Sequence, residues 1–213
     1  MLNRWTERVE QAGGDYAAAS AQWAIAAAPK KHVKRLLGQM AYGAERCMYC
    51  EDNLGTDIDH VQPLAVAPLR AFDWLNHLLA CSYCNSHTKG RQYPCDADGR
   101  SLLIDPSTED PADHLVLRLA ASVYDPLSDK GRETIWVFRL NRGDLVQGRR
   151  LAFVTAQSLL VEWQRTRQAH NTAREKDLVE ALTQTPFADV VQTMCVCHSQ
   201  LRLLCRQLPS QPR

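Results

Sequence analysis

The chain has 213 residues, of which 45% are hydrophobic, so it is long enough to bury a core of its own. Its net charge of only +1 excludes a uniformly basic nucleic-acid coat, and any nucleic-acid surface must therefore be local. Because no apolar run approaches the roughly 20 residues that span a bilayer, and the N-terminus lacks a signal-peptide pattern, we expect a cytoplasmic protein without a membrane partner.

The first predicted domain, residues 1–43, is a helical segment. Asp15 is a typical N-cap residue for an Ala-rich helix, which Pro29 is expected to stop. A further helix is expected over residues 30–42, with apolar residues on one side and a run of lysine and arginine on the other. That basic side is either a solvated face or a surface that contacts phosphates.

The second predicted domain, residues 44–100, has the order strand, loop, strand, helix. Asp57–His60 fits a short strand, and the prolines that follow predict a wide loop. The stretch His77–Ala80 fits a returning strand, and the residues from Asn85 onward fit the first turn of a helix.

The third predicted domain, residues 101–213, is a turn-rich linker followed by a C-terminal helical lobe. Its prolines predict turns, with short extended pieces at 115–119 and 122–124. The spacing of apolar residues predicts three long helical segments, over 145–165, 172–183 and 187–208. The chain as a whole is therefore predicted to be α+β and mostly helical.

Two CxxC pairs form the strongest motif in the chain. The four cysteines are Cys47, Cys50, Cys81 and Cys84. Each pair is a turn that directs two thiolates to one point, which suits a tetrahedral zinc ion. Because all four positions are filled by protein ligands, the predicted zinc is structural rather than catalytic. The alternative is four unrelated buried cysteines.

The segment between the two pairs carries the groups that phosphodiester hydrolysis needs. His60 can act as a general base, since its unperturbed pKa is about 6.5. Asp59 and Asn85 offer oxygen atoms to a hard divalent cation. Neighbouring strand residues point to opposite faces, so the backbone must bend if Asp59 and His60 are to reach one phosphate.

The segments CMYC, DIDHVQP and DWLNHLLACSYCN, with the lysine that follows, resemble the zinc-bearing HNH endonucleases of the ββα-metal type. The resemblance implies a ββα-metal core with a structural zinc site of four cysteines, flanked by N- and C-terminal helical lobes. It implies that His60 is the general base and that Asp59 and Asn85 hold a catalytic Mg²⁺ or Mn²⁺. It also implies that Asn76 braces the loop.

The third position of the motif is asparagine rather than histidine. His87 therefore stays an alternative to Asn85 as metal ligand, or a contact to phosphate. Lys89, one helical turn after Asn85, is a further candidate for a phosphate contact, and otherwise a solvated lysine.

A narrower resemblance covers about residues 33–150. The patterns YCE, DIDH, LLIDP, EDP and LNR are similar to the small HNH subunit of Septu-type and retron-associated anti-phage systems. Many of those relatives have glutamate where this chain has Asp59, which keeps the oxygen and shortens its reach. The resemblance implies an antiviral nuclease that acts with an ABC-like ATPase encoded beside it. The implied substrate is nucleic acid, with DNA favoured and RNA as an alternative.

A second hypothesis stays open at this point. The chain could be a zinc-binding subunit that contributes little catalysis and instead binds nucleic acid or recruits the ATPase. A relative without activity is expected to have lost Asp59, His60 or Asn85, and all three are present.

Overall fold

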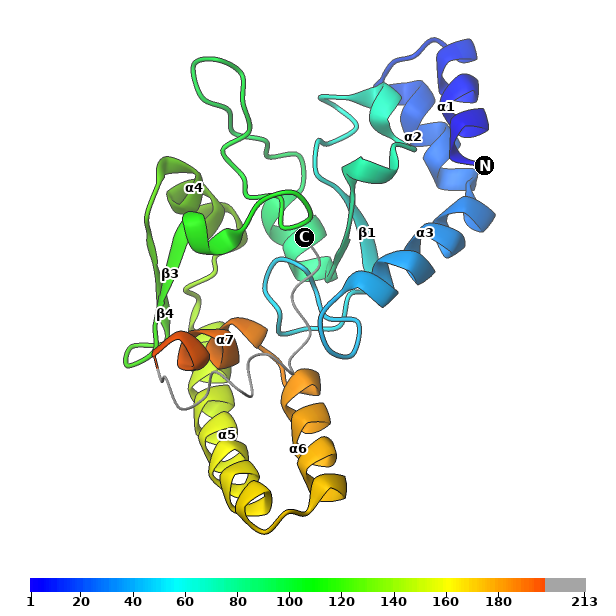
Figure 1. The fold of residues 1–213 in the computed structure, drawn as a ribbon. Coiled ribbons are helices and arrows are strands. Elements are labelled where there is room, and N and C mark those ends of the chain that lie inside the picture. Colours follow the sequence, from blue (N-terminus) through cyan, green and yellow to red (C-terminus); the bar gives the residue numbers. More distant parts are fainter. Residues whose placement is uncertain (198–213) are drawn as a thin grey trace.

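The computed structural model describes residues 1–197 and has an α+β fold in which helices predominate (Figure 1). Its N-terminal helices are α1 Leu2–Gln11, α2 Tyr16–Ile25 and α3 Ala27–Met40. Asp15 caps α2 as predicted, because its Oδ1 accepts a hydrogen bond from Ala18 N at 2.9 Å. The predicted helix stop at Pro29 is wrong. Pro29 lies in the first turn of α3, where its missing N–H costs no helical hydrogen bond.

The predicted order of strand, loop, strand and helix is present in the centre of the chain. Strands β1 Asp57–His60 and β2 His77–Ala80 pair antiparallel, with His60 opposite His77. The loop between them contains two 3₁₀ turns, η1 Pro68–Arg70 and η2 Trp74–Asn76. A π-helical segment, η3 Tyr83–Lys89, follows β2 almost directly.

The C-terminal part, as far as residue 197, contains a second two-stranded antiparallel sheet and four helices (Figure 1). The elements are η4 Pro111–Asp113, β3 Leu115–Arg118, β4 Val123–Pro126, α4 Asp129–Phe138, α5 Gly143–Gln168, α6 Thr172–Gln184 and α7 Ala188–Cys197. The helix predicted over 187–208 is confirmed as far as Cys197. The remainder of that prediction lies outside the described residues. None of the helices in the described part of the chain has the length and apolar character needed to cross a membrane.

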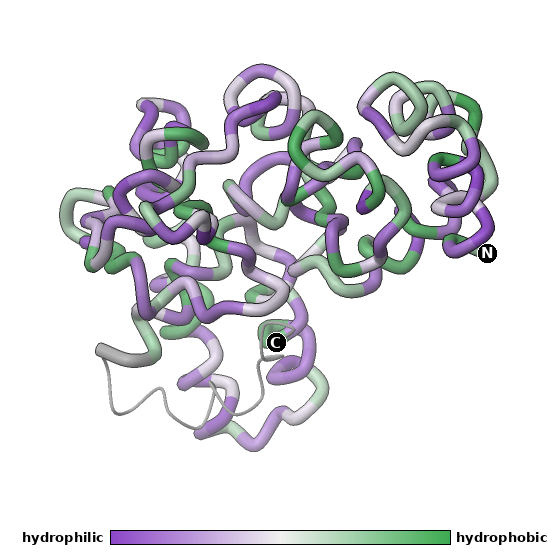
Figure 2. The backbone as a smooth tube through the Cα atoms, turned by 90° about the horizontal axis from the view of Figure 1, so that it is seen from above, coloured by the Kyte–Doolittle hydropathy of each residue, from purple (hydrophilic) through white to green (hydrophobic). Residues whose placement is uncertain are grey.

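Hydrophobic and hydrophilic segments alternate along the chain, as expected for helices with one buried side (Figure 2). The largest apolar cluster joins the four CxxC cysteines to residues of α4, α5, α6 and α7. A second cluster joins α1 and α2 to Ala71 and Phe72 in the loop after β1. A third joins Val33 and Leu37 of α3 to Leu79 of β2. The β1–β2 hairpin is therefore held between the N-terminal helices and the C-terminal lobe.

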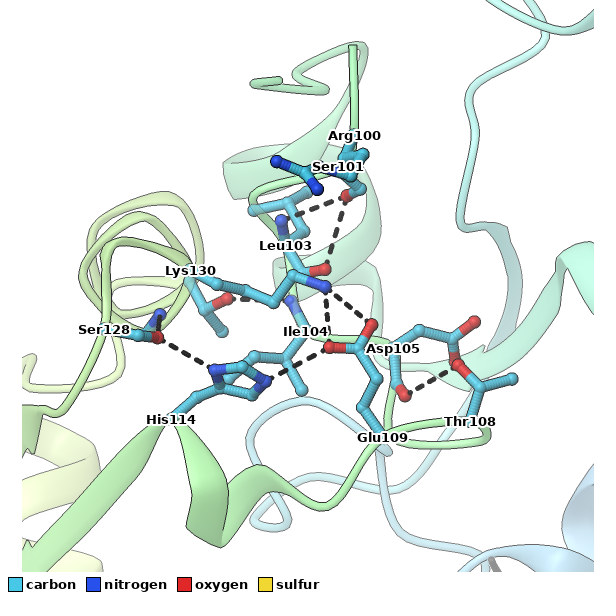
Figure 3. Close-up of polar contacts among 12 residues, drawn as sticks. Arg100, Ser101, Leu103, Ile104, Asp105, Thr108, Glu109, His114, Ser128 and Lys130 are labelled. Carbon is cyan, nitrogen blue, oxygen red and sulfur yellow. Dashed lines mark hydrogen bonds and ion pairs between the residues drawn. The ribbon is translucent and has the colours of Figure 1, made fainter. Parts of the chain in front are cut away.

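A polar cluster fixes the turn-rich segment to the start of α4 (Figure 3). The carboxylate of Glu109 accepts hydrogen bonds from Lys130 Nζ at 2.7 and 2.6 Å and lies 3.3 Å from His114 Nε2. His114 Nδ1 lies 2.8 Å from the hydroxyl of Ser128. Ser128 also caps α4 by accepting a hydrogen bond from Gly131 N at 3.1 Å. Side-chain contacts therefore attach this segment to the start of α4.

Candidate active site and metal centre

The four cysteines of the CxxC pairs meet in one buried cluster. The Sγ atoms of Cys47, Cys50, Cys81 and Cys84 all lie within 4.8 Å of one another. Those of Cys50 and Cys81 are 3.9 Å apart. A tetrahedral zinc with Zn–S bonds of about 2.3 Å needs sulfur atoms about 3.8 Å apart. The cluster can therefore hold a zinc ion, as the sequence predicts.

Backbone hydrogen bonds connect this cluster to the hairpin. Met48 N, inside the first CxxC turn, donates to Leu79 O of β2 at 2.8 Å. In the second turn, Cys84 N points to Cys81 Sγ at 3.4 Å, which suits a thiolate as acceptor. The cluster thus joins the chain before β1 to the chain after β2, and it fixes η3 relative to both strands.

Asp59 is buried with a lysine beside it. Its side chain is 4% exposed, and Nζ of Lys89 lies 3.0 Å from its Oδ1 and 2.9 Å from its Oδ2. The hydroxyl of Tyr49 donates to Oδ2 at 2.5 Å. Burial nevertheless raises the pKa of Asp59, because desolvation outweighs the opposing effects of Lys89 and Tyr49. Lys89, predicted as a phosphate contact or a solvated lysine, is instead an interior residue whose side chain is 1% exposed.

His60 lies on the opposite face of β1, beneath α2. Its Nε2 is 3.0 Å from the carbonyl oxygen of Ala71, and its ring meets the Trp23 ring edge-on at 4.5 Å. A carbonyl can only accept, so Nε2 carries the proton and Nδ1 keeps its lone pair. Burial, reinforced by the neighbouring His77, lowers the pKa of His60 to about 3. At neutral pH the imidazole is therefore in the uncharged form that a general base requires.

His77 is a site residue that sequence analysis missed. Its Nε2 also lies 3.0 Å from Ala71 O, and its ring stacks on Trp23 at 5.3 Å. Burial lowers the pKa of His77 to about 4. Pairing the two predicted strands would have placed His77 opposite His60. The contact with Trp23 of α2 could not be inferred, because Trp23 lies outside the motif.

Asn76 connects distant parts of the loop between the two strands by hydrogen bonds. Its side chain is fully buried. Its Oδ1 accepts from Gln62 N at 2.7 Å, and its Nδ2 donates to Gln62 O and Arg70 O, both at 3.1 Å. The loop carries Ala71, so this brace also fixes the carbonyl that orients His60.

The two predicted ligands of the catalytic metal face different partners. Asn85 Nδ2 donates to Asp57 Oδ2 at 3.2 Å, whereas Asp59 is paired with Lys89. Within residues 1–197, no hydrogen bond joins Asp59 to Asn85. The alternative ligand His87 is exposed, and its Nδ1 lies 3.2 Å from Ser82 O. The described residues therefore fit the zinc, whereas the second metal site stays a prediction.

Comparisons of the chain with protein-family models, with curated proteins and with solved structures give no match. The functional interpretation therefore depends on the residues and on their geometry.

The first prediction concerns the cysteine cluster. Elemental analysis of the purified protein should find one zinc per chain, and Cys81→Ser should lose it together with much of the fold, since a structural zinc contributes on the order of 10 kcal/mol. The matched control is Cys95→Ser, because Cys95 is an exposed thiol outside the cluster. Wild-type protein that is folded, free of zinc and fully alkylated at the four thiols would contradict this prediction.

The second prediction concerns acid stability. His77 is buried in its uncharged form with a pKa of about 4, below the ordinary value of 6.5. The unfolded chain takes up this proton below pH 6.5 and the folded chain does not, so stability is lost as the pH falls from about 6.5 to about 4. In His77→Phe, the loss of unfolding free energy between pH 7 and pH 4 should be smaller by about 3 kcal/mol.

Urea unfolding of wild type and His77→Phe at both pH values measures this difference. Any loss of zinc in acid is common to both proteins and cancels. The control is His32→Phe, because His32 is exposed on α3 and its replacement should leave the wild-type acid loss unchanged. Equal acid losses in wild type and His77→Phe would show that burial of His77 does not govern the pH dependence.

Proposed function

We propose that the chain is an HNH-type endonuclease that hydrolyses phosphodiester bonds in nucleic acid, with DNA as the favoured substrate. The observation that carries the proposal is the state of His60. Its Nε2–H is fixed on Ala71 O, which leaves the lone pair on Nδ1 to accept a proton. An uncharged imidazole with one oriented N–H and one available lone pair is the arrangement that a general base uses.

In the proposed reaction, His60 Nδ1 accepts a proton from the water whose oxygen bonds to phosphorus. The P–O bond to the leaving oxygen breaks, and that oxygen takes up a proton from solvent. Asn76 and Ala71 keep the imidazole in place, because the brace fixes the loop and the carbonyl fixes the ring. The low pKa of His60 makes it a weak base in the free protein, and the negative charge of a bound phosphate would raise that pKa toward neutrality. The sequence motif and this geometry together support the proposal.

A divalent metal, when bound, would neutralise charge on the phosphate and on the leaving oxygen. The resemblance assigns this metal to Asp59 and Asn85. Asp59 is paired with the Lys89 ammonium, and the carboxylate that contacts Asn85 is that of Asp57. Because Asp59 and Asn85 have different partners in this structure, we assign no step to the metal and treat both carboxylates as candidates for it.

The third prediction tests this function. His60→Ala should keep its zinc and its fold and should cleave DNA about 10²–10⁴-fold more slowly than wild type, the range for a lost general base. Cleavage should require added Mg²⁺ or Mn²⁺. His170→Ala is the control, because His170 is an exposed histidine between α5 and α6 that has no part in the candidate site. Comparison of Asp59→Asn with Asp57→Asn identifies which carboxylate the metal uses.

Wild-type cleavage rates in His60→Ala would remove His60 from the mechanism. Absence of cleavage by the wild type, with DNA binding retained, would instead favour the zinc-binding subunit without catalysis. Cleavage without any added divalent cation would contradict the proposed metal dependence.

We further propose that the chain is the nuclease of an anti-phage system and that it binds an ABC-like ATPase encoded beside it. The narrower sequence resemblance motivates this partner. The C-terminal lobe offers a surface for it: Leu151, Val154 and Val161 lie on one side of α5 and are 61%, 59% and 48% exposed. Exposed apolar residues in a row are typical of a surface that a partner covers.

The fourth prediction concerns this row. The wild-type chain should co-purify with the neighbouring ATPase, and Leu151→Glu with Val154→Glu should abolish the complex while leaving the zinc content unchanged. Thr172→Glu with Ala173→Glu provides the matched control, because both residues are exposed and lie on α6 rather than in the row. Size-exclusion chromatography of the co-expressed proteins measures the complex. A wild-type chain that elutes alone would overturn this assignment of the partner.

A further inference from the structure

The N-terminal part of the chain contains a local excess of positive charge. No acidic residue occurs between Asp15 and Glu45, although the chain contains 24 acidic residues in 213. The same interval contains four cationic residues, Lys30, Lys31, Lys34 and Arg35. The net charge of the whole chain is only +1, so this excess is a property of α3 and not of the protein in general.

Packing directs this charge outward along one side of α3. Val33 and Leu37 are buried against Leu79 of β2, and they fix which side of the helix faces the hairpin. Lys31 and Arg35, which are separated by one helical turn, are both exposed. The cationic side of α3 is thus held in a fixed orientation by the apolar side.

The charged side of α3 also lies next to the strand that carries the candidate base. Lys34 Nζ donates to Thr56 O at 2.6 Å, and Thr56 immediately precedes β1. His60 follows four residues later, which is about 13 Å along an extended strand. About 13 Å corresponds to about four nucleotides of one strand of B-DNA along its axis. A duplex positioned at His60 could therefore extend along α3.

We propose that the exposed side of α3, centred on Lys31 and Arg35, binds the phosphate backbone of duplex DNA beside the cleavage site. The choice of DNA rests on the proposed function. Three observations carry the surface itself: the interval without acidic residues, the orientation set by Val33 and Leu37, and the contact of Lys34 with the start of β1. Cations on a fixed helix release the counterions of DNA when they contact its phosphates, which favours binding without base recognition.

Fluorescence anisotropy of a labelled DNA duplex with the full chain tests the proposal, in buffer without added Mg²⁺ or Mn²⁺ so that binding is separated from cleavage. Lys31→Glu with Arg35→Glu should weaken binding at least about tenfold and should lower the slope of log Kd against log salt by about 2, as expected for two lost phosphate contacts. Arg174→Glu with Lys176→Glu on α6 makes the same change of charge at exposed positions and should leave binding close to that of wild type.

Equal weakening by the α3 and α6 pairs would overturn the proposal, because only the total charge would then matter. Unchanged duplex binding by the α3 variant would also overturn it, as would a loss confined to single-stranded DNA or to RNA. Failure of the proposed function gives a different result: duplex binding depends on Lys31 and Arg35 while no cleavage occurs with added metal. In that case, the proposed DNA-binding surface is supported and the proposed nuclease activity is rejected.

Discussion

The four thiols buried in one small volume are the constraint on which the central hairpin depends. β1 and β2 have only four residues each, and a two-stranded hairpin of this size is marginally stable in water. One cysteine pair precedes β1 and the other follows β2, and both lie within the largest apolar cluster. A zinc ion bound there would contribute on the order of 10 kcal/mol and would connect the hairpin to the C-terminal lobe. The positions of Asp59 and η3 depend on that connection.

A single backbone carbonyl organises the other face of the hairpin. Ala71 O contacts both His60 and His77, and Trp23 packs on both rings. The loop that carries Ala71 is long and mostly irregular, so it needs the buried side chain of Asn76 to hold it in place. The N-terminal helices are therefore part of the candidate site, because Trp23 covers both imidazoles and contributes to the burial that lowers their pKa values.

Local sequence signals predicted the strands, the cap at Asp15 and the four-cysteine cluster, because each of these depends on a short pattern. They failed at Pro29. Proline stops most helices, but Pro29 lies in the first turn of α3, where its backbone needs no N–H donor. They also failed at Lys89, since burial of a lysine depends on a carboxylate 30 residues earlier in the chain. Contacts between distant segments, such as Trp23 with His77, have no periodic signature and were visible only in the folded chain.

The buried pair of Lys89 and Asp59 explains how a carboxylate can lie inside the hairpin. An isolated buried carboxylate would lose its hydration and take up a proton, whereas the Lys89 ammonium and the Tyr49 hydroxyl replace part of that hydration. Lys89 Nζ also donates to His60 O at 2.5 Å, so one ammonium fixes Asp59 and the backbone of the candidate base together. The two residues point to opposite faces of β1, and Lys89 is the side chain that couples their positions.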